Sequence, residues 1–288
     1  MQTETSQYLT TAEVARLLGV TETTVKRWAD ARRIPYVRTP GGHRRFRRQD
    51  VLAFIQAIGY SAQEQLLRES SGSVRVSSSV VGRLQEELYR RLLAGDTSAV
   101  WRQLYSCYLA GMELAALYDE VVAPTLQRVG EQWSCGQLSV AHEHLASNTL
   151  LEALQAFRHL TRSEGLYHRR AVCAAVEPEE HVFGLLMAAH VLEGSGYRVD
   201  FLGARTPVAD LAEWISMYRP HVLCLGFVMP LPEEHARELL RVLRQEAVQS
   251  GTRVFAGGRA ADPAWAAEGL VDGVYSTFRG LKAAVAAV

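Results

Sequence analysis

The stretch RAVCAAVEPEEHVFG, residues 170–184, determines how the second half of the chain folds. Its first seven residues are almost all apolar, which is typical of a strand buried on both faces of a sheet. The polar segment EPEE follows, and apolar residues at helical spacing begin at residue 182. A buried strand, a polar loop and a helix in this order predict the first unit of a parallel α/β sheet.

The same alternation continues towards the C-terminus. Apolar runs predict further strands at 198–202, 221–225, 253–256 and 273–275, with helices at 182–192, 208–217 and 233–247. Strands that alternate with helices at this interval indicate a doubly wound, Rossmann-like sheet. Ligands of such sheets bind beyond the carboxyl ends of the strands, which is where the loop 177–184 is expected.

This loop contains a candidate metal ligand, His181. Glu179 stands two residues earlier and can accept the Nδ1 proton, which leaves Nε2 to bind a metal, and Gly184 has no side chain to keep a flat macrocycle away. The pattern resembles the DxHxxG signature of the cobalamin-binding domains of methionine synthase and corrinoid-dependent mutases, with Glu in place of Asp. The resemblance implies that the chain binds cobalamin and that His181 ligates its cobalt.

Two glycine-containing segments extend this resemblance. Gly257 and Gly258 follow the fourth predicted strand and match the glycine pair beside which the nucleotide tail of the cofactor passes. After the third strand, Gly226 and Val228 stand in a GFV segment where the family has Ser-x-Leu. Both segments are expected to contact the cofactor, with one hydrogen bond to the tail missing or replaced.

The middle of the chain is helical, with amphipathic runs at 80–93, 100–112, 114–133 and 140–160 that predict a four-helix bundle. Trp133 ends the third run, and Glu143 and His144 begin the fourth. This spacing resembles the upper-face motif of the CarH/LitR-type cobalamin-dependent photoreceptors. It implies that the bundle caps adenosylcobalamin, with Trp133 beside the adenosyl group and the Glu-His pair adjoining it.

One residue departs from the photoreceptor pattern. Members of that family often have a His directly after the tryptophan, which can capture cobalt after photolysis, whereas this chain has Ser134. Either His142 or His144 takes over that role, or the response differs in reversibility or in signal.

The N-terminal 56 residues predict a helix-turn-helix. Apolar residues at helical spacing over 12–18 are followed by Gly19 and by a second helix that ends near residue 28. The core behind these helices is expected to contain Val14, Leu18, Val25 and Trp28. The second helix is expected to place four side chains against bases and phosphates: Thr23, Thr24, Lys26 and Arg27.

A basic hairpin follows the two helices. An extended segment at 34–38 leads into TPGGHRRF at 39–46, which predicts a wing whose cations lie along the DNA phosphates. The wing residues expected to contact DNA are Arg38, His43, Arg44, Arg45 and Arg47. The stretch from Leu9 to Phe46, and GGHRRF above all, resembles the MerR family of transcription regulators and its excisionase-like relatives, which implies binding to double-stranded operator DNA.

These patterns divide the chain into a MerR-type winged helix at 1–58, a linker at 59–79, a cobalamin-capping four-helix bundle at 80–165 and a Rossmann-like cobalamin domain at 166–288. The serine-rich linker replaces the long coiled coil through which many MerR-type proteins dimerise. The downstream domains must therefore assemble the expected homo-oligomer, a dimer or a tetramer.

Composition sets the outer limits. The net charge is zero, but residues 26–48 contain nine Lys or Arg and a single acid, Asp30. The N-terminal part of the chain is therefore strongly basic although the whole chain is neutral. There is no export signal and no apolar run of about 18 residues, so we expect a cytoplasmic protein with no membrane partner. The four scattered cysteines form no CxxC and are expected to be reduced and mostly buried.

The expected function is transcription regulation, most simply repression, in which light removes the upper ligand of cobalamin, the oligomer loosens and the operator is released. One alternative is a MerR-type regulator that senses another cobalamin form, a redox state or another ligand without light. Another is a corrinoid methyl carrier or mutase fragment, although the chain shows no nucleophile-base pair and no substrate barrel. Repression by the cofactor-free protein is a third alternative. We expect no enzymatic activity.

Overall fold

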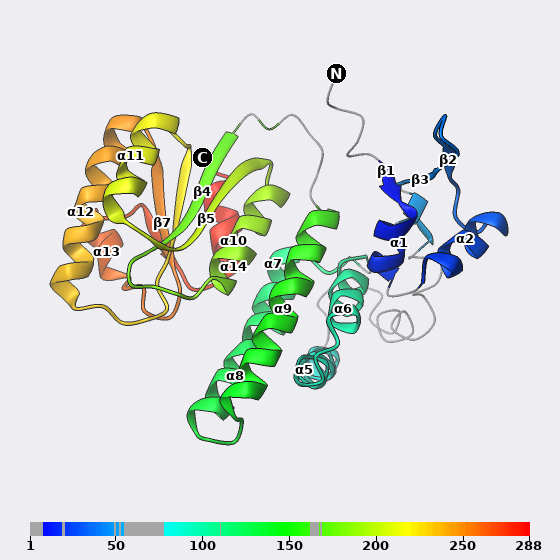
Figure 1. The fold of residues 1–288 in the computed structure, drawn as a ribbon. Coiled ribbons are helices and arrows are strands. Elements are labelled where there is room, and N and C mark those ends of the chain that lie inside the picture. The colour runs from blue at the N-terminus through cyan, green and yellow to red at the C-terminus, as the bar shows by residue number, and fades with distance from the viewer. Residues whose placement is uncertain are drawn as a thin grey trace. The chain divides into compact units, whose positions relative to one another are not determined.

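A computed structural model of the chain describes residues 8–18, 21–48, 50–51, 53–54, 78–109, 111–161, 167 and 169–288 (Figure 1). The chain forms two compact units, the first of residues 1–112 and 124–157 and the second of residues 113–123 and 158–288. The predicted turn at Gly19 and nearly all of the predicted linker lie outside the described residues.

The N-terminal head is a winged helix-turn-helix, as predicted. Its elements are β1 (Tyr8–Thr10), α1 (Thr11–Leu18), α2 (Glu22–Asp30), β2 (Val37–Arg38) and β3 (Arg44–Arg47). The strands pair antiparallel in the order β1-β3-β2. Thr10 and Glu13 form a reciprocal capping box, with bonds of 2.7 and 3.1 Å, at the start of α1.

A small apolar core holds the head together. Val14, Val25, Ile34 and Phe46 are fully buried in it, and Trp28 packs against it half-buried. Three of the four core residues predicted from the sequence are therefore confirmed, and the side chain of Leu18 is not among those described.

Helices form the middle of the chain. They are α5 (Ser78–Leu93), α6 (Thr97–Leu109), α7 (Leu114–Leu117), the π-helical turn η1 (Tyr118–Val122), α8 (Ala123–Ser134) and α9 (Val140–Thr161). The predicted helix at 114–133 is thus continuous helical structure with a π-turn in its first half. Apolar spacing does not reveal such a turn, because one extra residue in a single turn barely changes the periodicity.

The second unit is built on a parallel sheet. Its strands are β4 (Arg169–Val176), β5 (Tyr197–Thr206), β6 (Val222–Gly226), β7 (Arg253–Gly257) and β8 (Gly273–Tyr275). Across the sheet they lie in the order β5-β4-β6-β7-β8, and all neighbours pair in parallel. The helices between and after them are α10 (Phe183–Gly194), α11 (Val208–Tyr218), α12 (Glu233–Ser250), α13 (Ala264–Ala267) and α14 (Phe278–Val285). The doubly wound fold is confirmed, while α13 and α14 were not predicted.

The strand order explains where a ligand can bind. β4, the first strand of the sheet in sequence, lies between β5 and β6, so the chain leaves it on one side and returns on the other. Helices cover both faces of the sheet (Figure 1). Ala171 and Cys173 face the cluster that contains α10 and α14 residues, and Val172 and Ala174 face the cluster with α11 and α12 residues. The loop after β4 therefore opens at a topological switch point, the usual ligand crevice of such sheets.

Three of the four cysteines, Cys107, Cys173 and Cys224, are buried thiols, and Cys135 is exposed. In the described part of the chain, no helix is both long and apolar enough to span a bilayer.

Candidate functional site

The predicted recognition helix α2 offers polar and basic side chains to the outside. Thr23, Lys26 and Arg27 are exposed. Thr24 is half-buried. Its hydroxyl and its backbone N–H lie 3.0 and 3.3 Å from Oγ1 of Thr21, the residue that caps the helix. Thr24 therefore helps to begin the helix and is less available to a duplex than its neighbours.

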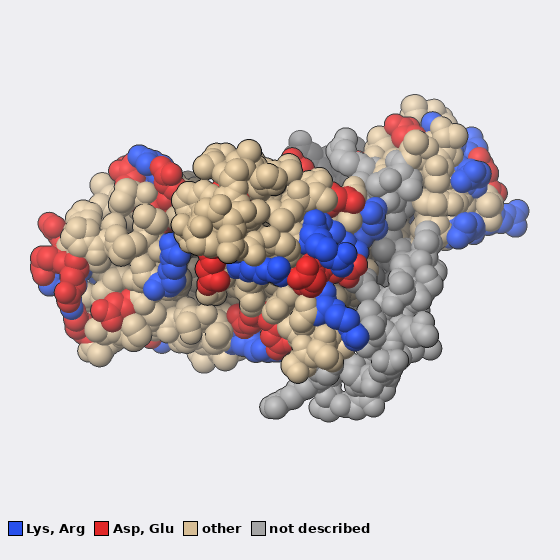
Figure 2. Space-filling model, turned by 90° about the horizontal axis from the view of Figure 1, so that it is seen from below, with Lys and Arg blue, Asp and Glu red and all other residues tan. Residues whose placement is uncertain are grey.

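The wing consists of β2, β3 and the turn between them. The backbone N–H of Thr39 donates to the carbonyl of His43 at 2.9 Å, and Gly42 adopts φ +79°, which closes the turn tightly. The predicted DNA contacts of the wing divide into exposed residues, Arg38, His43 and Arg47, and half-buried residues, Arg44 and Arg45. Figure 2 shows Lys and Arg side chains gathered on the head, at the right of the view.

The loop after β4 holds Glu179 and His181 in a defined arrangement. Oε1 of Glu179 lies 2.6 Å from Nδ1 of His181 and accepts the backbone N–H of the same residue at 3.0 Å. The Glu179 side chain is 4 % exposed, and that of His181 is 45 % exposed. When the carboxylate accepts the Nδ1 proton of the neutral imidazole, the free lone pair of His181 lies on Nε2, which is the nitrogen that can bind a metal.

The second oxygen of Glu179 joins this loop to the loop after β6. Oε2 accepts the backbone N–H groups of Val228 and Met229 at 2.6 and 2.7 Å. Burial raises the pKa of Glu179, but the backbone N–H groups of Met229, His181 and Val228 outweigh burial and keep that pKa below its ordinary value. Glu179 is therefore a carboxylate at neutral pH. Each of its oxygens has two hydrogen-bond partners.

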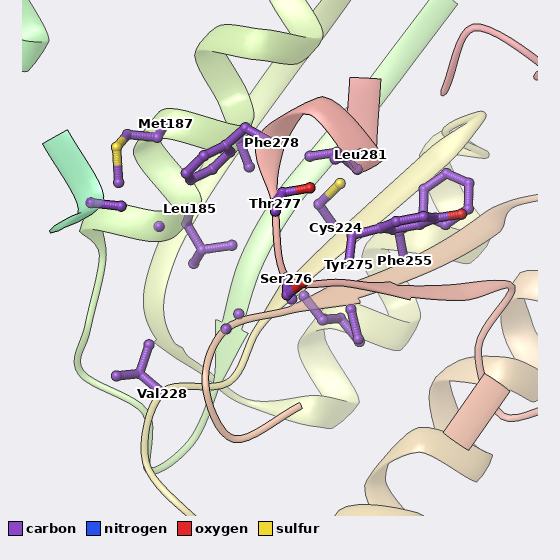
Figure 3. A pocket seen from close by; sticks show the side chains of 18 of the residues that line it. Leu185, Met187, Cys224, Val228, Phe255, Tyr275, Ser276, Thr277, Phe278 and Leu281 are labelled. Atoms are coloured by element: carbon purple, nitrogen blue, oxygen red, sulfur yellow. The ribbon is translucent and has the colours of Figure 1, made fainter. Parts of the chain in front are cut away.

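An apolar cavity of about 220 Å³ opens beside His181, at the carboxyl ends of β6 and β7 and against α10 and α14 (Figure 3). Six of the residues predicted to bind metal or cofactor line it: His181, Gly184, Gly226, Val228, Gly257 and Gly258. The structure thus brings together, at one cavity, residues that are up to 77 positions apart in the sequence. Glu179 joins them through its bond to His181.

Other lining residues escaped the sequence analysis. Leu185, Cys224, Phe255 and Leu281 form apolar walls, and the segment 275–278 adds the hydroxyls of Ser276 and Thr277 (Figure 3). The missed residues at 275–281 belong to the end of β8 and to α14. Their signal is weak, because a three-residue strand and an eight-residue helix leave little periodicity to detect.

The four glycines that line the cavity differ in what an added Cβ would contact. Gly258 has φ +109°, and a Cβ there would lie 2.1 Å from the carbonyl oxygen of Phe227. A Cβ on Gly226 would lie 3.0 Å from Leu185, and one on Gly257 would lie 3.0 Å from a backbone oxygen. Around Gly184, by contrast, a Cβ would meet none of the described atoms within 4 Å. Gly184 therefore leaves open space next to His181.

These observations fit a corrinoid. A corrinoid brings most of its metal's ligands with it and can take one further donor from a protein, and the half-exposed His181 offers Nε2 for that role. The open space at Gly184 admits a flat ring, and the apolar cavity admits an aromatic tail.

Trp133, Glu143 and His144 lie in the first unit, near the tip of the hairpin that α8 and α9 form (Figure 1). Trp133 is 48 % exposed. Oε1 of Glu143 accepts the hydroxyl of Ser147 at 2.6 Å, and Nε2 of His144 lies 3.7 Å from Oε2 of Glu143. These three residues share one hairpin, whereas His181 belongs to the second unit.

The two alternatives to the missing histidine are also on this hairpin. Ser134 donates its hydroxyl to the carbonyl of Glu131 at 2.8 Å, which ties it to its own helix. Nδ1 of His142 lies 2.7 Å from the hydroxyl of Ser139. The side chain of His144 is 69 % exposed, and His142 is exposed as well, so both imidazoles are accessible at this end of α9.

Three protein-family models match the chain. A helix-turn-helix domain matches residues 8–58, one B12 binding domain matches residues 84–158, and another B12 binding domain matches residues 169–286. The matches cover the head, the helical middle and the α/β sheet in turn.

Among curated proteins, the chain is 33 % identical over 267 residues to the HTH-type transcriptional repressor CarH of Myxococcus xanthus, covering 86 % of this chain and 87 % of that protein. It is 29 % identical over 240 residues to CarA, a repressor of the same organism, covering 80 % of this chain and 81 % of CarA. A dimethylamine corrinoid protein of Methanosarcina mazei is 24 % identical over 161 residues, which cover 54 % of this chain and 73 % of that protein.

Among solved structures, the monomethylamine corrinoid protein of Methanosarcina barkeri is similar, with a TM-score of 0.60 and 12 % identity over 71 % of this chain and 98 % of that one. At this identity the likeness concerns the fold alone.

Proposed function

We propose that this chain, which belongs to the family of helix-turn-helix transcriptional repressors with B12-binding domains that includes CarH and CarA, is a repressor. Its affinity for DNA depends on adenosylcobalamin and light. The winged head binds double-stranded operator DNA. The helical middle and the α/β unit both contribute residues to cofactor binding and assemble the protein into a dimer or tetramer.

The observation that carries this proposal is the Glu179–His181 pair beside the apolar cavity. His181 holds cobalt through Nε2, and Glu179 keeps that nitrogen unprotonated and aimed by fixing Nδ1 at 2.6 Å. Gly184 lets the ring approach. The cavity walls, with Gly226, Val228, Gly257 and Gly258, would hold the nucleotide tail of the cofactor.

The upper side of the cofactor is covered by Trp133, with Glu143 and His144 next to it. The cofactor supplies a cobalt–carbon bond that light breaks. Trp133 is half-exposed on its own hairpin, so an adenosyl group gives it the apolar partner that the hairpin lacks. Loss of that group removes the partner, loosens the oligomer and ends the avidity of several heads for repeated half-sites.

One observation favours a second candidate, a repressor that distinguishes cobalamin forms without light. Ser134 stands where light-responsive members often have a histidine, and its hydroxyl is bound to Glu131. A methyl-carrier function is less well supported, since the similarity to corrinoid proteins of methylamine metabolism covers 54 % of the chain and leaves the head unexplained.

A single experiment separates these candidates. A duplex is first selected from a random-sequence pool by the full chain with adenosylcobalamin in darkness. Mass by light scattering and retardation of this duplex are then measured together, before and after green light, with methylcobalamin and hydroxocobalamin as comparison cofactors.

The light-responsive function predicts that illumination lowers both mass and retardation for the adenosylcobalamin complex alone. Differences between cofactors that persist unchanged under light favour the second candidate. Absorption spectra that the protein does not perturb, and that are the same for His181→Ala, contradict the cobalt-ligand assignment.

A further inference from the structure

The Arg44 guanidinium has an unusual environment for a wing cation. It forms an ion pair of 2.5 Å with Asp30 and lies 5.2 Å from the ring centroid of Tyr36. Its side chain is 18 % exposed. Asp30 is the last residue of α2 and Arg44 is the first residue of β3. One side chain therefore joins the base of the wing to the end of the recognition helix.

Tyr36 connects this contact to the core of the head. Its ring packs on Phe46 at 6.0 Å, and Phe46 is fully buried. The pKa of Tyr36 is lowered, chiefly by Arg38 and then by Arg44, because both guanidinium groups stand close to its phenol. Nε of Arg44 is buried and has no hydrogen-bond partner among the described residues. The ion pair between Nη2 and Asp30 therefore neutralises the Arg44 charge within the head, while its Nε makes no hydrogen bond among the described residues.

The other basic residues of this surface differ. Arg27, Arg38 and Arg47 are exposed, and Lys26 has a weaker partner, Glu22, at 3.5 Å. A phosphate contact by Arg44 would require breaking its bond to Asp30 and leaving the ring of Tyr36. The exposed cations have no ion pair as short to break, although Arg38 also interacts with Tyr36 and Nε of Arg47 donates to the hydroxyl of Tyr8 at 3.1 Å.

We propose that Arg44 is a positioning residue that braces the wing against α2 through Asp30 and Tyr36, and not a phosphate contact. The brace sets the distance between the wing and the recognition helix, so that both reach a duplex together. This inference rests on the proposed DNA-binding function and assigns a different role to one of the residues that the sequence places on the DNA.

Two carboxylates on α2 give a matched test, because the two roles of Arg44 predict opposite signs. Glu22 and Asp30 are similarly exposed, 51 % and 59 %, and each pairs with one cation. Glu22→Gln removes one negative charge near DNA and should raise affinity for the selected duplex about twofold. Asp30→Asn removes the same charge but breaks the brace, so affinity should fall about three- to tenfold.

The salt dependence gives a second test. Arg27→Gln, which removes an exposed cation, should lower the slope of log affinity against log salt by about 0.9. Arg44→Gln should weaken binding and leave that slope unchanged. Hydroxyl-radical footprints of the Asp30→Asn complex should lose protection where the wing lies and keep it where α2 lies, a separation that general unfolding of the head cannot produce.

Thermal unfolding of each full-length variant shows whether the head still folds, and Asp30→Asn is the safer variant because its side chain is exposed. Tighter binding by Asp30→Asn, or a reduced salt slope for Arg44→Gln, overturns the inference and leaves the DNA-binding function standing. If the unsubstituted chain selects no duplex at all, the proposed function itself is wrong.

Discussion

The two sets of residues proposed to hold the cofactor differ in how far the protein prepares them. His181 is held by a buried carboxylate that accepts hydrogen bonds from His181 itself and from the backbone of Val228 and Met229. Trp133 is 48 % exposed at the tip of a hairpin. The lower face is therefore organised by the fold, whereas the upper face gains most of its burial from whatever the protein binds.

The difference follows from the supporting structure. Glu179 and His181 lie at the end of a strand in the interior of the sheet, so neighbouring loops surround them and supply N–H groups. The end of α8 is supported by the helical hairpin that it forms with α9. We propose that this difference lets the lower residues hold the corrinoid while the upper residues respond to its upper group.

The largest expected effect tests whether the cavity is set by the fold. Gly258→Ala places a Cβ 2.1 Å from a backbone oxygen at φ +109°, so we expect a loss of about 4 kcal/mol in unfolding free energy. Gly184→Ala is the matched control, because its Cβ meets open space and alanine favours helix by about 1 kcal/mol.

Chemical denaturation measures both variants without cofactor. Gly184→Ala should keep its stability and lose corrinoid affinity. Equal stability of the two variants, or unimpaired corrinoid binding by Gly184→Ala, would contradict the distinction between glycines required for packing and the glycine that faces the ring.

The next effect concerns the carboxylate that organises the lower face. Glu179→Gln replaces one acceptor oxygen with an NH₂ group that faces backbone N–H groups, so corrinoid affinity should fall about 10- to 100-fold. Glu180→Gln is the control, because the exposed Glu180 is bonded only to Arg205, at 2.9 Å, among the contacts described. Spectroscopic titration with hydroxocobalamin measures both, and similar affinities would show that Glu179 does not prepare His181.

A third effect compares buried and exposed histidines. His190, in the second unit, lies between the hydroxyls of Tyr118 and Thr161, and its burial, with a smaller effect of Arg158, lowers its pKa from 6.5 to about 3. His190 in the unfolded chain therefore binds a proton near pH 6.5, whereas His190 in the folded chain binds one only near pH 3. Stability is full above pH 6.5 and is lost as the pH falls towards the folded value, by about 2 kcal/mol at pH 5.

His190→Gln should reduce this loss in denaturation curves measured between pH 7 and pH 5. His144→Gln should leave it unchanged, because the side chain of His144 is 69 % exposed. If the two variants show the same pH dependence as the parent, His190 is not the group that titrates.

The smallest effect concerns the upper face. Trp133→Ala removes a half-exposed side chain, so its unfolding free energy should change by less than about 1 kcal/mol, while the preference for adenosylcobalamin over hydroxocobalamin should fall about tenfold. Calorimetric titration in darkness measures the preference. An unchanged preference would place the adenosyl group elsewhere.

The part of the site whose residues follow a strand with a clear apolar pattern was predictable. Glu179, His181 and Gly258 could be placed at one edge of a sheet before any distance was known. Their partners could not be predicted in the same way. Val228 contributes a backbone N–H to Glu179, and backbone groups leave no mark in the identity of a residue. Leu281 lies on a helix too short to show a pattern.

Arg44 illustrates the same limit in the head. A run of cations predicts a basic surface correctly, but it does not show which cation points outward. That depends on whether an acid and an aromatic ring stand within reach after folding, and Asp30 and Tyr36 are 14 and 8 residues away in the sequence.

The amino-acid sequence by itself determined the order of the elements, the parallel sheet, the winged head and the candidate metal ligand, because periodicity and motif spacing are local properties of the chain. Tertiary structure alone decided which N–H groups hold Glu179, which of the cavity glycines has room for a Cβ and which arginine is held within the head. Those outcomes depend on pairs of residues far apart in the sequence, and only packing determines which of them meet.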